Sequence, residues 1–299
     1  MRLHKGYPRK IRGLFTAIIT PFDAKGRVDI EAFTALVKFQ VSKGVDGIYA
    51  CGSTGLGPLL SLEERKAVAE AATESSKGRV PVVVQVGCAD TPSTIELARH
   101  AEKAGAYAVA SLTPYYYKPG EKAIAGHFEA VSRAVTIPLL AYNIPQFTGN
   151  NIGPGMVSAL ARNGSILGIK DSSRDLLQLQ DILDAVPEGF VVMNGTEEYG
   201  LYAMMSGADG LVSGGASALP ETFHSMVVAQ REGDYRRASA AQRTILRIKD
   251  AVRKSPIPAY YEILRARGMD CGRPRGPFQP LEGTDARQVI EELRDLDLL

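Results

Sequence analysis

The sequence predicts a (β/α)8 TIM barrel, a fold of the α/β class, followed by a C-terminal helical extension. The chain has 299 residues, which fits a barrel of about 250 residues with an appendage. Apolar runs rich in β-branched residues alternate with amphipathic stretches, as expected for repeated βα units. Two successive runs end at Tyr142 and Lys170, twenty-eight residues apart, which is the length of one repeat.

A barrel of this kind is closed by eight strands, and the sequence contains eight apolar runs that could form them. We expect strands near residues 14–20, 46–51, 80–87, 107–112, 137–142, 165–170, 190–194 and 209–213. These runs lead into Thr20, Thr54, Gly87, Pro114, Tyr142, Lys170, Gly195 and Ser213. The carboxyl ends of barrel strands carry the active site in this fold, so functional side chains are sought there.

The stretches between the strands have the length and apolar spacing of crossover helices. They include residues 30–43, 62–77, 94–103 and 176–186. Ser61 and Glu64 form the pattern of a capping box, and Asp90 before Pro92 is typical of a helix start.

The pattern changes after Ser213, where helical periodicity continues to the end of the chain without strand-like runs. Helices are expected at 235–252, 258–267 and 285–296, while prolines exclude a helix at 273–280. We therefore expect a barrel domain at residues 1–233 and a helical extension at 234–299.

Composition excludes several classes of function. The net charge is only +2 with no long basic block, so we expect no nucleic-acid partner. The sequence has no run of eighteen or more apolar residues, so no membrane span is predicted. The first residues lack the apolar segment of a secretion signal, so a cytoplasmic location is expected.

Neither the cysteines nor the histidines predict a metal site. Cys51, Cys88 and Cys271 are far apart and odd in number, so reduced packing thiols are expected. The four histidines show no ligand pairing; they are His4, His100, His127 and His224.

Lys170 and Tyr142 are the strongest catalytic candidates. If their runs are neighbouring strands, the amine and the phenol emerge on the same face of the barrel. An apolar setting disfavours the charged ammonium, and the neutral amine can attack a ketone to form a Schiff base. The alternative is an ordinary solvated lysine that points into a loop.

Two further strand ends carry polar groups. The loop 52–58 (GSTGLGP) combines glycines with the hydroxyls of Ser53 and Thr54, which suits a carboxylate, although such turns are common. Tyr115, Tyr116 and Tyr117 are consecutive and could serve packing, a subunit interface or proton transfer. Asp171 alternates away from Lys170 and is expected to cap the following helix.

Six short segments of the chain form a recognisable set: 17–22 (AIITPF), 52–55 (GSTG), 113–116 (TPYY), 142–145 (YNIP), 148–149 (TG) and 168–171 (GIKD). Their order and spacing resemble those of the dihydrodipicolinate synthase/N-acetylneuraminate lyase family, and the resemblance covers nearly the whole chain. The resemblance implies a barrel with a C-terminal helical extension, usually a homotetramer that is a dimer of dimers. It also implies a metal-free class I aldolase or lyase that uses pyruvate and needs no cofactor.

The resemblance assigns roles to the candidate residues. Lys170 would be the Schiff-base lysine and Tyr142 the acid/base. Ser53 and Thr54 would bind the carboxylate of the keto acid. Tyr116, contributed by a neighbouring subunit, and Thr54 would extend the proton relay of Tyr142.

Gly195 and Val212 would form the backbone and wall positions around the bound keto acid.

Departures from the family pattern favour one subgroup. Phe147 occupies the place where dihydrodipicolinate synthases carry an arginine for the second substrate, and an apolar ring cannot replace a guanidinium. Leu56 follows Gly52–Gly55 where many members carry glutamate. The segments 52–61, 194–195 and 273–281 are similar to archaeal 2-keto-3-deoxygluconate aldolases, so cleavage of a 2-keto-3-deoxy sugar acid is favoured.

The sequence is compatible with several alternative functions. Within the family they are an N-acetylneuraminate lyase, a 4-hydroxy-2-oxoglutarate aldolase, a lyase of a dehydrated sugar acid or a dihydrodipicolinate synthase. A non-catalytic keto-acid sensor is the alternative from another class. Lys118 and Arg275 are either phosphate ligands or ordinary surface groups.

Overall fold

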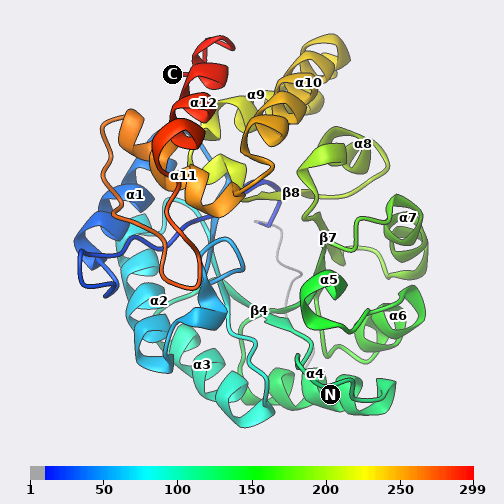
Figure 1. Cartoon of the computed structure of the whole chain (residues 1–299). Coiled ribbons are helices and arrows are strands. Elements are labelled where there is room, and N and C mark those ends of the chain that lie inside the picture. The colour runs from blue at the N-terminus through cyan, green and yellow to red at the C-terminus, as the bar shows by residue number, and fades with distance from the viewer. Residues whose placement is uncertain (1–10) are drawn as a thin grey trace.

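Eight parallel strands close a barrel in the order of the sequence, which confirms the predicted fold class (Figure 1). The computed structural model describes residues 11–299; the first ten residues, His4 among them, lie outside the described part. The strands are β1 (Gly13–Ala17), β2 (Gly47–Ala50), β3 (Val82–Gln85), β4 (Ala108–Leu112), β5 (Leu139–Asn143), β6 (Gly168–Asp171), β7 (Val191–Asn194) and β8 (Gly210–Ser213).

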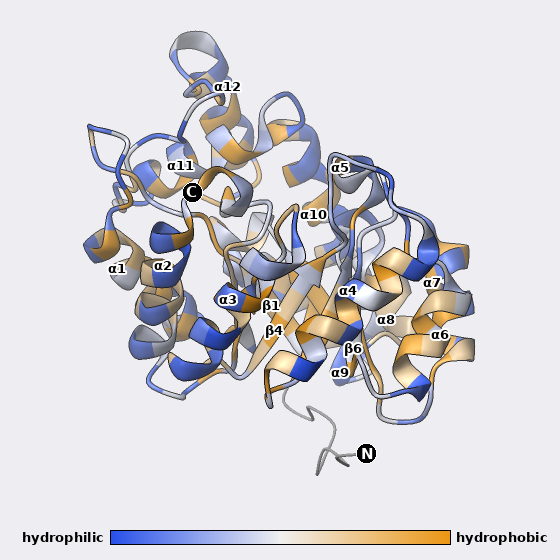
Figure 2. Cartoon of the chain, turned by 90° about the horizontal axis from the view of Figure 1, so that it is seen from below, coloured by the Kyte–Doolittle hydropathy of each residue, from blue (hydrophilic) through white to orange (hydrophobic). Residues whose placement is uncertain are grey.

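Each strand overlaps its predicted run but is shorter. The apolar residues that continue past a strand remain buried in loops, so hydrophobicity alone overestimates the strand. After β1, for example, Ile18 and Ile19 are fully buried, and the amide of Ile19 donates to Ser217 Oγ at 3.0 Å. Every residue of β1, β4 and β6 is buried, and the ribbons of β1 and β4 are largely orange, which marks hydrophobic residues (Figure 2).

Helices surround the barrel and alternate with the strands (Figure 1). They are α1 (Ile30–Ser42), α2 (Leu62–Ser76), α3 (Thr91–Lys103), α4 (Glu121–Ala134), α5 (Pro145–Thr148), α6 (Pro154–Arg162), α7 (Leu176–Ala185), α8 (Gly200–Met205) and α9 (Pro220–Arg231). Within residues 11–299, no helix is long and apolar enough to cross a membrane.

Two of the three helix starts were predicted correctly. Ser61 and Glu64 form the capping box of α2, and Asp90 accepts a hydrogen bond from the amide of Ser93 at the start of α3. The prediction for Asp171 was wrong, because Asp175 caps α7. Asp171 lies within β6, where its carboxylate instead accepts from Asn143 Nδ2 at 2.7 Å.

The C-terminal residues form α10 (Tyr235–Val252), α11 (Pro256–Ala266) and α12 (Gly283–Arg294) on one side of the barrel (Figure 1). Helix α10 packs along α9. The proline-rich segment 273–280 is not helical, as expected.

Arg275 fastens this segment to the barrel and is therefore neither a free surface group nor an available phosphate ligand. Its guanidinium donates to the carbonyl oxygens of Gly26 and Leu59 and to both carboxylate oxygens of Glu64. It also lies 4.6 Å from the ring centroid of Phe22.

Candidate active site

A cavity of about 620 Å³ opens at the carboxyl ends of the strands. Lys170 and Tyr142 both line it, as do loops that follow the strands and residues of the C-terminal extension. This is the end of the barrel at which enzymes of this fold carry out their chemistry.

Lys170 and Tyr142 are register partners on the adjacent strands β6 and β5, so their side chains project to the same side. Lys170 Nζ lies 3.9 Å from the ring centroid of Tyr142 and 4.5 Å from that of Tyr49. Lys170 is only 4% exposed, and no carboxylate among the described residues pairs with it. The amine is therefore enclosed by two aromatic rings rather than by charged groups.

Tyr49 belongs to this cluster but was missed by the sequence analysis. Its ring meets the ring of Tyr142 edge to face, with centroids 5.9 Å apart. Its hydroxyl is buried without a hydrogen-bond partner among the described residues, and burial raises its pKa well above the usual value. The available signal was alternation along β2, where Tyr49 is in register with Ala17 and Val83 of the neighbouring strands.

The loop after β2 brings two hydroxyls to the cavity. Ser53 Oγ lies 3.3 Å from Tyr142 Oη, and Thr54 lines the cavity as well. The loop turns so tightly that a Cβ on Gly57 would lie 1.9 Å from the carbonyl oxygen of Cys51, so this position requires glycine. A Cβ on Gly214, after β8, would lie 2.7 Å from Thr54 Oγ1, so the two loops pack against each other.

Gly195 and Val212 also line the cavity, as expected from the resemblance. A Cβ on Gly195 would lie 1.9 Å from Ser172 Oγ and 2.9 Å from Lys170 Cε. Any larger residue at position 195 would therefore collide with the side chain of Lys170 in its present conformation.

Tyr116 does not line the cavity of its own chain. Its side chain is 86% exposed, its φ is 78°, and its ring packs edge to face on Tyr117. Tyr115 lines the cavity instead.

Besides Lys170, the cavity is lined by four charged residues that were not predicted from the sequence. They are Arg174, Glu197, Glu198 and Lys249. They lie after β6, after β7 and on α10, and no motif links positions so far apart.

Glu197, which is buried, and Lys249, which is partly buried, form an ion pair with 3.1 Å between Glu197 Oε2 and Lys249 Nζ. The other oxygen of Glu197 accepts from Ser213 Oγ and from the amide of Gly215, both at 2.7 Å. Burial acts to raise the pKa of Glu197, but Lys249 and these hydrogen bonds hold it below the usual value. The ion pair connects α10 to the segment after β7, and the hydrogen bonds of Glu197 extend this connection to the end of β8.

Apolar side chains cover much of the remaining wall. Phe147 lines the cavity and is 70% exposed, and Leu56 and Phe278 lie on the same lining. At residue 147 the lining is therefore an apolar ring and not a guanidinium.

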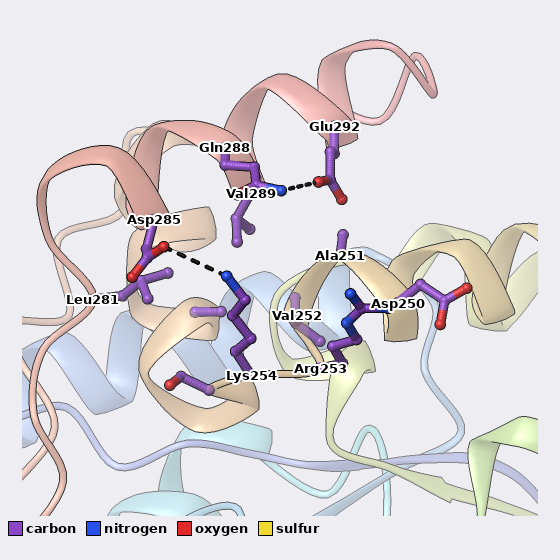
Figure 3. Close-up of a pocket in the computed structure, with 12 residues that line it drawn as sticks. Asp250, Ala251, Val252, Arg253, Lys254, Leu281, Asp285, Gln288, Val289 and Glu292 are labelled. Atoms are coloured by element: carbon purple, nitrogen blue, oxygen red, sulfur yellow. Dashed lines mark hydrogen bonds and ion pairs between the residues drawn. The ribbon is translucent and has the colours of Figure 1, made fainter.

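Within residues 11–299, no group of histidine, cysteine or acidic side chains is suited to hold a metal ion. The three cysteines are buried and free, and burial raises the pKa of Cys51 to about 11. A second, smaller cavity of about 140 Å³ lies between α10, α11 and α12, where Lys254 faces Asp285 at 3.8 Å (Figure 3). It contains none of the predicted site residues.

Comparisons with known proteins agree with this fold. Residues 10–296 match the model of the dihydrodipicolinate synthetase family. The 4-hydroxy-tetrahydrodipicolinate synthase of Nitrosospira multiformis is 37% identical over 287 residues, which is 95% of both chains, and that of Chlorobium phaeobacteroides is 33% identical over 294 residues, covering 97% of this chain and 99% of the relative.

Several solved structures are similar to this chain over nearly its whole length. YagE, a prophage protein of the dihydrodipicolinic acid synthase family from E. coli K12 in complex with pyruvate, superposes with a TM-score of 0.93 at 30% identity, covering 97% of this chain and 99% of YagE. The sialic acid aldolase of Ruminococcus gnavus gives 0.92 at 28% identity, covering 97% and 100%. The chain therefore belongs to the dihydrodipicolinate synthase/N-acetylneuraminate lyase family, whose members are pyruvate-dependent class I carbon–carbon lyases that form a Schiff base through a lysine and need no cofactor.

Proposed function

We propose that this protein reversibly cleaves a 2-keto-3-deoxy sugar acid to pyruvate and an aldehyde, in the manner of a 2-keto-3-deoxygluconate aldolase, with Lys170 as the Schiff-base residue. The observation that carries the proposal is the burial of the Lys170 amine against the rings of Tyr142 and Tyr49, with no carboxylate paired to it among the described residues. A non-catalytic sensor would not need this arrangement.

The reaction begins when the neutral amine of Lys170 attacks the C2 ketone of the sugar acid. Loss of water gives an iminium that withdraws electrons from the adjacent carbons. Tyr142 takes the proton of the C4 hydroxyl, the C3–C4 bond breaks, and the aldehyde leaves. The remaining enamine is protonated at C3, and hydrolysis releases pyruvate and the free lysine.

The neighbouring groups complete the chemistry. Ser53 and Thr54 hold the carboxylate of the keto acid, while Gly195 and Val212 form the wall beside it. A phenol is a weak base at neutral pH, so Tyr142 needs a hydrogen-bonded relay. The 3.3 Å contact of Tyr142 with Ser53 supports such a connection.

Thr54 takes part in this relay together with Tyr116 of a neighbouring subunit. The outward, exposed ring of Tyr116 supports a role in another subunit of a homotetramer rather than in its own cavity.

The choice of a sugar acid rests on Phe147. Condensation with aspartate semialdehyde requires a partner for a second carboxylate, and the phenyl ring of Phe147 provides none at the position where dihydrodipicolinate synthases carry an arginine. Dihydrodipicolinate synthase is the second candidate, because curated relatives with 33% and 37% identity carry that activity in their names.

Borohydride reduction in the presence of pyruvate tests the shared chemistry. Mass spectrometry should find a three-carbon acid attached to Lys170, and Lys170→Met should remain unlabelled. Absence of the label would exclude the Schiff base at this residue.

A panel of aldehydes assayed with pyruvate then separates the two candidates. Glyceraldehyde should be preferred over aspartate semialdehyde. The reverse preference would identify the second candidate as the function.

A further inference from the structure

Arg174 is a cavity-lining residue for which the reaction described above gives no role. It lies four residues after Lys170, in the connection between β6 and α7. Its side chain forms no hydrogen bond or ion pair with any residue of the described part of the chain. Its φ is +65°, in the left-handed region that L-residues other than glycine rarely adopt.

An uncommon backbone conformation at a cavity wall points to a use for the side chain. Glycine would occupy this backbone position without steric conflict, so the arginine is not there for the turn itself. Its guanidinium supplies up to five hydrogen-bond donors to the cavity.

The surrounding charges indicate what those donors meet. The charge of Lys249 is balanced by Glu197, and Glu198 adds a carboxylate to the cavity lining. Apart from Lys170, the cavity is lined by two cations and two anions, which leaves no net positive charge to hold a phosphate dianion. Donors and acceptors in one cavity lining instead suit neutral hydroxyl groups, which both donate and accept hydrogen bonds.

We propose that Arg174 is a specificity-determining residue that donates hydrogen bonds to the hydroxyls of the aldehyde half of the substrate, and that this half is not phosphorylated. This inference rests on the proposed function and adds to it the residue that recognises the aldehyde half.

The test compares two acceptors of equal carbon number, D-glyceraldehyde and propanal, each assayed with pyruvate on the same protein preparation. The ratio of the two kcat/KM values cancels differences in active fraction. Arg174→Gly removes the guanidinium at a backbone position that glycine accepts. Lys77→Gly is the matched control, because Lys77 also has a positive φ of 48°, is exposed, and lies outside the cavity at the end of α2.

In Arg174→Gly, the glyceraldehyde-to-propanal ratio should fall by about 10-fold to 100-fold, as expected for loss of hydrogen bonds from a charged group. The ratio should not change in Lys77→Gly. Both variants should have melting temperatures at or above that of the unmodified protein, since glycine relieves the left-handed backbone at both positions.

An unchanged ratio in Arg174→Gly would overturn the assignment, because the residue would then be an ordinary surface group. A preference of the unmodified protein for glyceraldehyde 3-phosphate over glyceraldehyde would overturn the assignment of a non-phosphorylated tail. Both results are distinct from failure of the proposed function, in which Lys170 would not be labelled by pyruvate and borohydride at all.

Discussion

The amine of Lys170 lies 3.9 Å from the ring centroid of Tyr142, its register partner on the next strand of the barrel. The relationship follows from parallel pairing, which places partners at equal height with their side chains on the same side. It puts the proposed nucleophile and the proposed acid/base together without help from any loop. Their separation is fixed by the barrel itself, so changes at either residue can be interpreted as local chemistry.

Tyr142→Phe removes only the hydroxyl that lies near Ser53 and keeps the ring beside Lys170. We expect kcat to fall by about 10²-fold to 10⁴-fold, the usual contribution of a positioned acid or base. Borohydride should still attach pyruvate to Lys170, which mass spectrometry can verify. A variant with unaltered kcat would show that another group moves the proton.

Tyr49→Phe provides the contrasting change, because this ring also contacts Lys170 but its hydroxyl has no partner among the described residues. Removing a buried, unpaired hydroxyl should leave the free energy of unfolding the same or raise it by about 1 kcal/mol. Urea unfolding measures this directly. Destabilisation by more than this amount would mean that the hydroxyl has a partner in solution.

The residues that could be predicted from the sequence are those whose position depends on local pattern. Lys170 and Tyr142 end apolar runs one repeat apart, and eight such repeats predict the closed barrel. The interaction of Tyr49 with both residues could not be predicted, since it depends on which side chains of three strands meet inside the barrel. The same holds for Glu197 and Lys249, which are brought together only by the docking of α10.

The error at Asp171 has a related cause. An aspartate before a helix resembles a cap, but Asn143 of the neighbouring strand and Ser173 both donate to this carboxylate. Burial raises its pKa, and these hydrogen bonds oppose the shift. The carboxylate of Asp171 is thus held by a hydrogen bond between strands and does not cap a helix, and Asp175 caps α7 instead.

Gly195→Ala should impair catalysis through sterics, since the added Cβ would lie 2.9 Å from Lys170 Cε and 1.9 Å from Ser172 Oγ. We expect kcat/KM to fall by at least about 10-fold, because small displacements of reacting groups are costly. The matched control is Gly126→Ala, in the interior of α4, where a Cβ meets nothing within 4 Å.

The control should keep full activity and gain about 0.5–1 kcal/mol of stability from the better helix former. Steady-state kinetics and urea unfolding of both variants check the pair. Equal activities in the two variants would contradict the steric explanation.

Arg275→Lys should loosen the C-terminal loop from the barrel. Lysine keeps the charge but cannot contact Gly26, Leu59 and both oxygens of Glu64 at once. We expect the free energy of unfolding to fall by about 1–3 kcal/mol. Hydrogen exchange should become faster in residues 270–282, and the prediction fails if exchange there matches that of the unmodified protein.

His127 should make the protein less stable in mild acid. Its ring is buried between Thr91 and Ser111, with hydrogen bonds of 2.9 Å and 3.1 Å, and burial lowers its pKa to about 4. In the unfolded chain the histidine pKa is about 6.5. Between these values the unfolded chain binds a proton that the folded chain does not, so stability decreases as the pH falls through this window.

The size of this effect at pH 4.5, relative to pH 7.5, should be about 2–3 kcal/mol. Urea unfolding of the unmodified protein and of His127→Gln at both pH values isolates it, because all other titrating groups are common to the two proteins. His127→Gln loses hydrogen bonds at both pH values, so its absolute stability does not report on the titration. The informative quantity is the change in its free energy of unfolding between the two pH values, which should be smaller than in the unmodified protein. Equal pH dependence of the two proteins would show that His127 is already protonated in the folded state above pH 4.5.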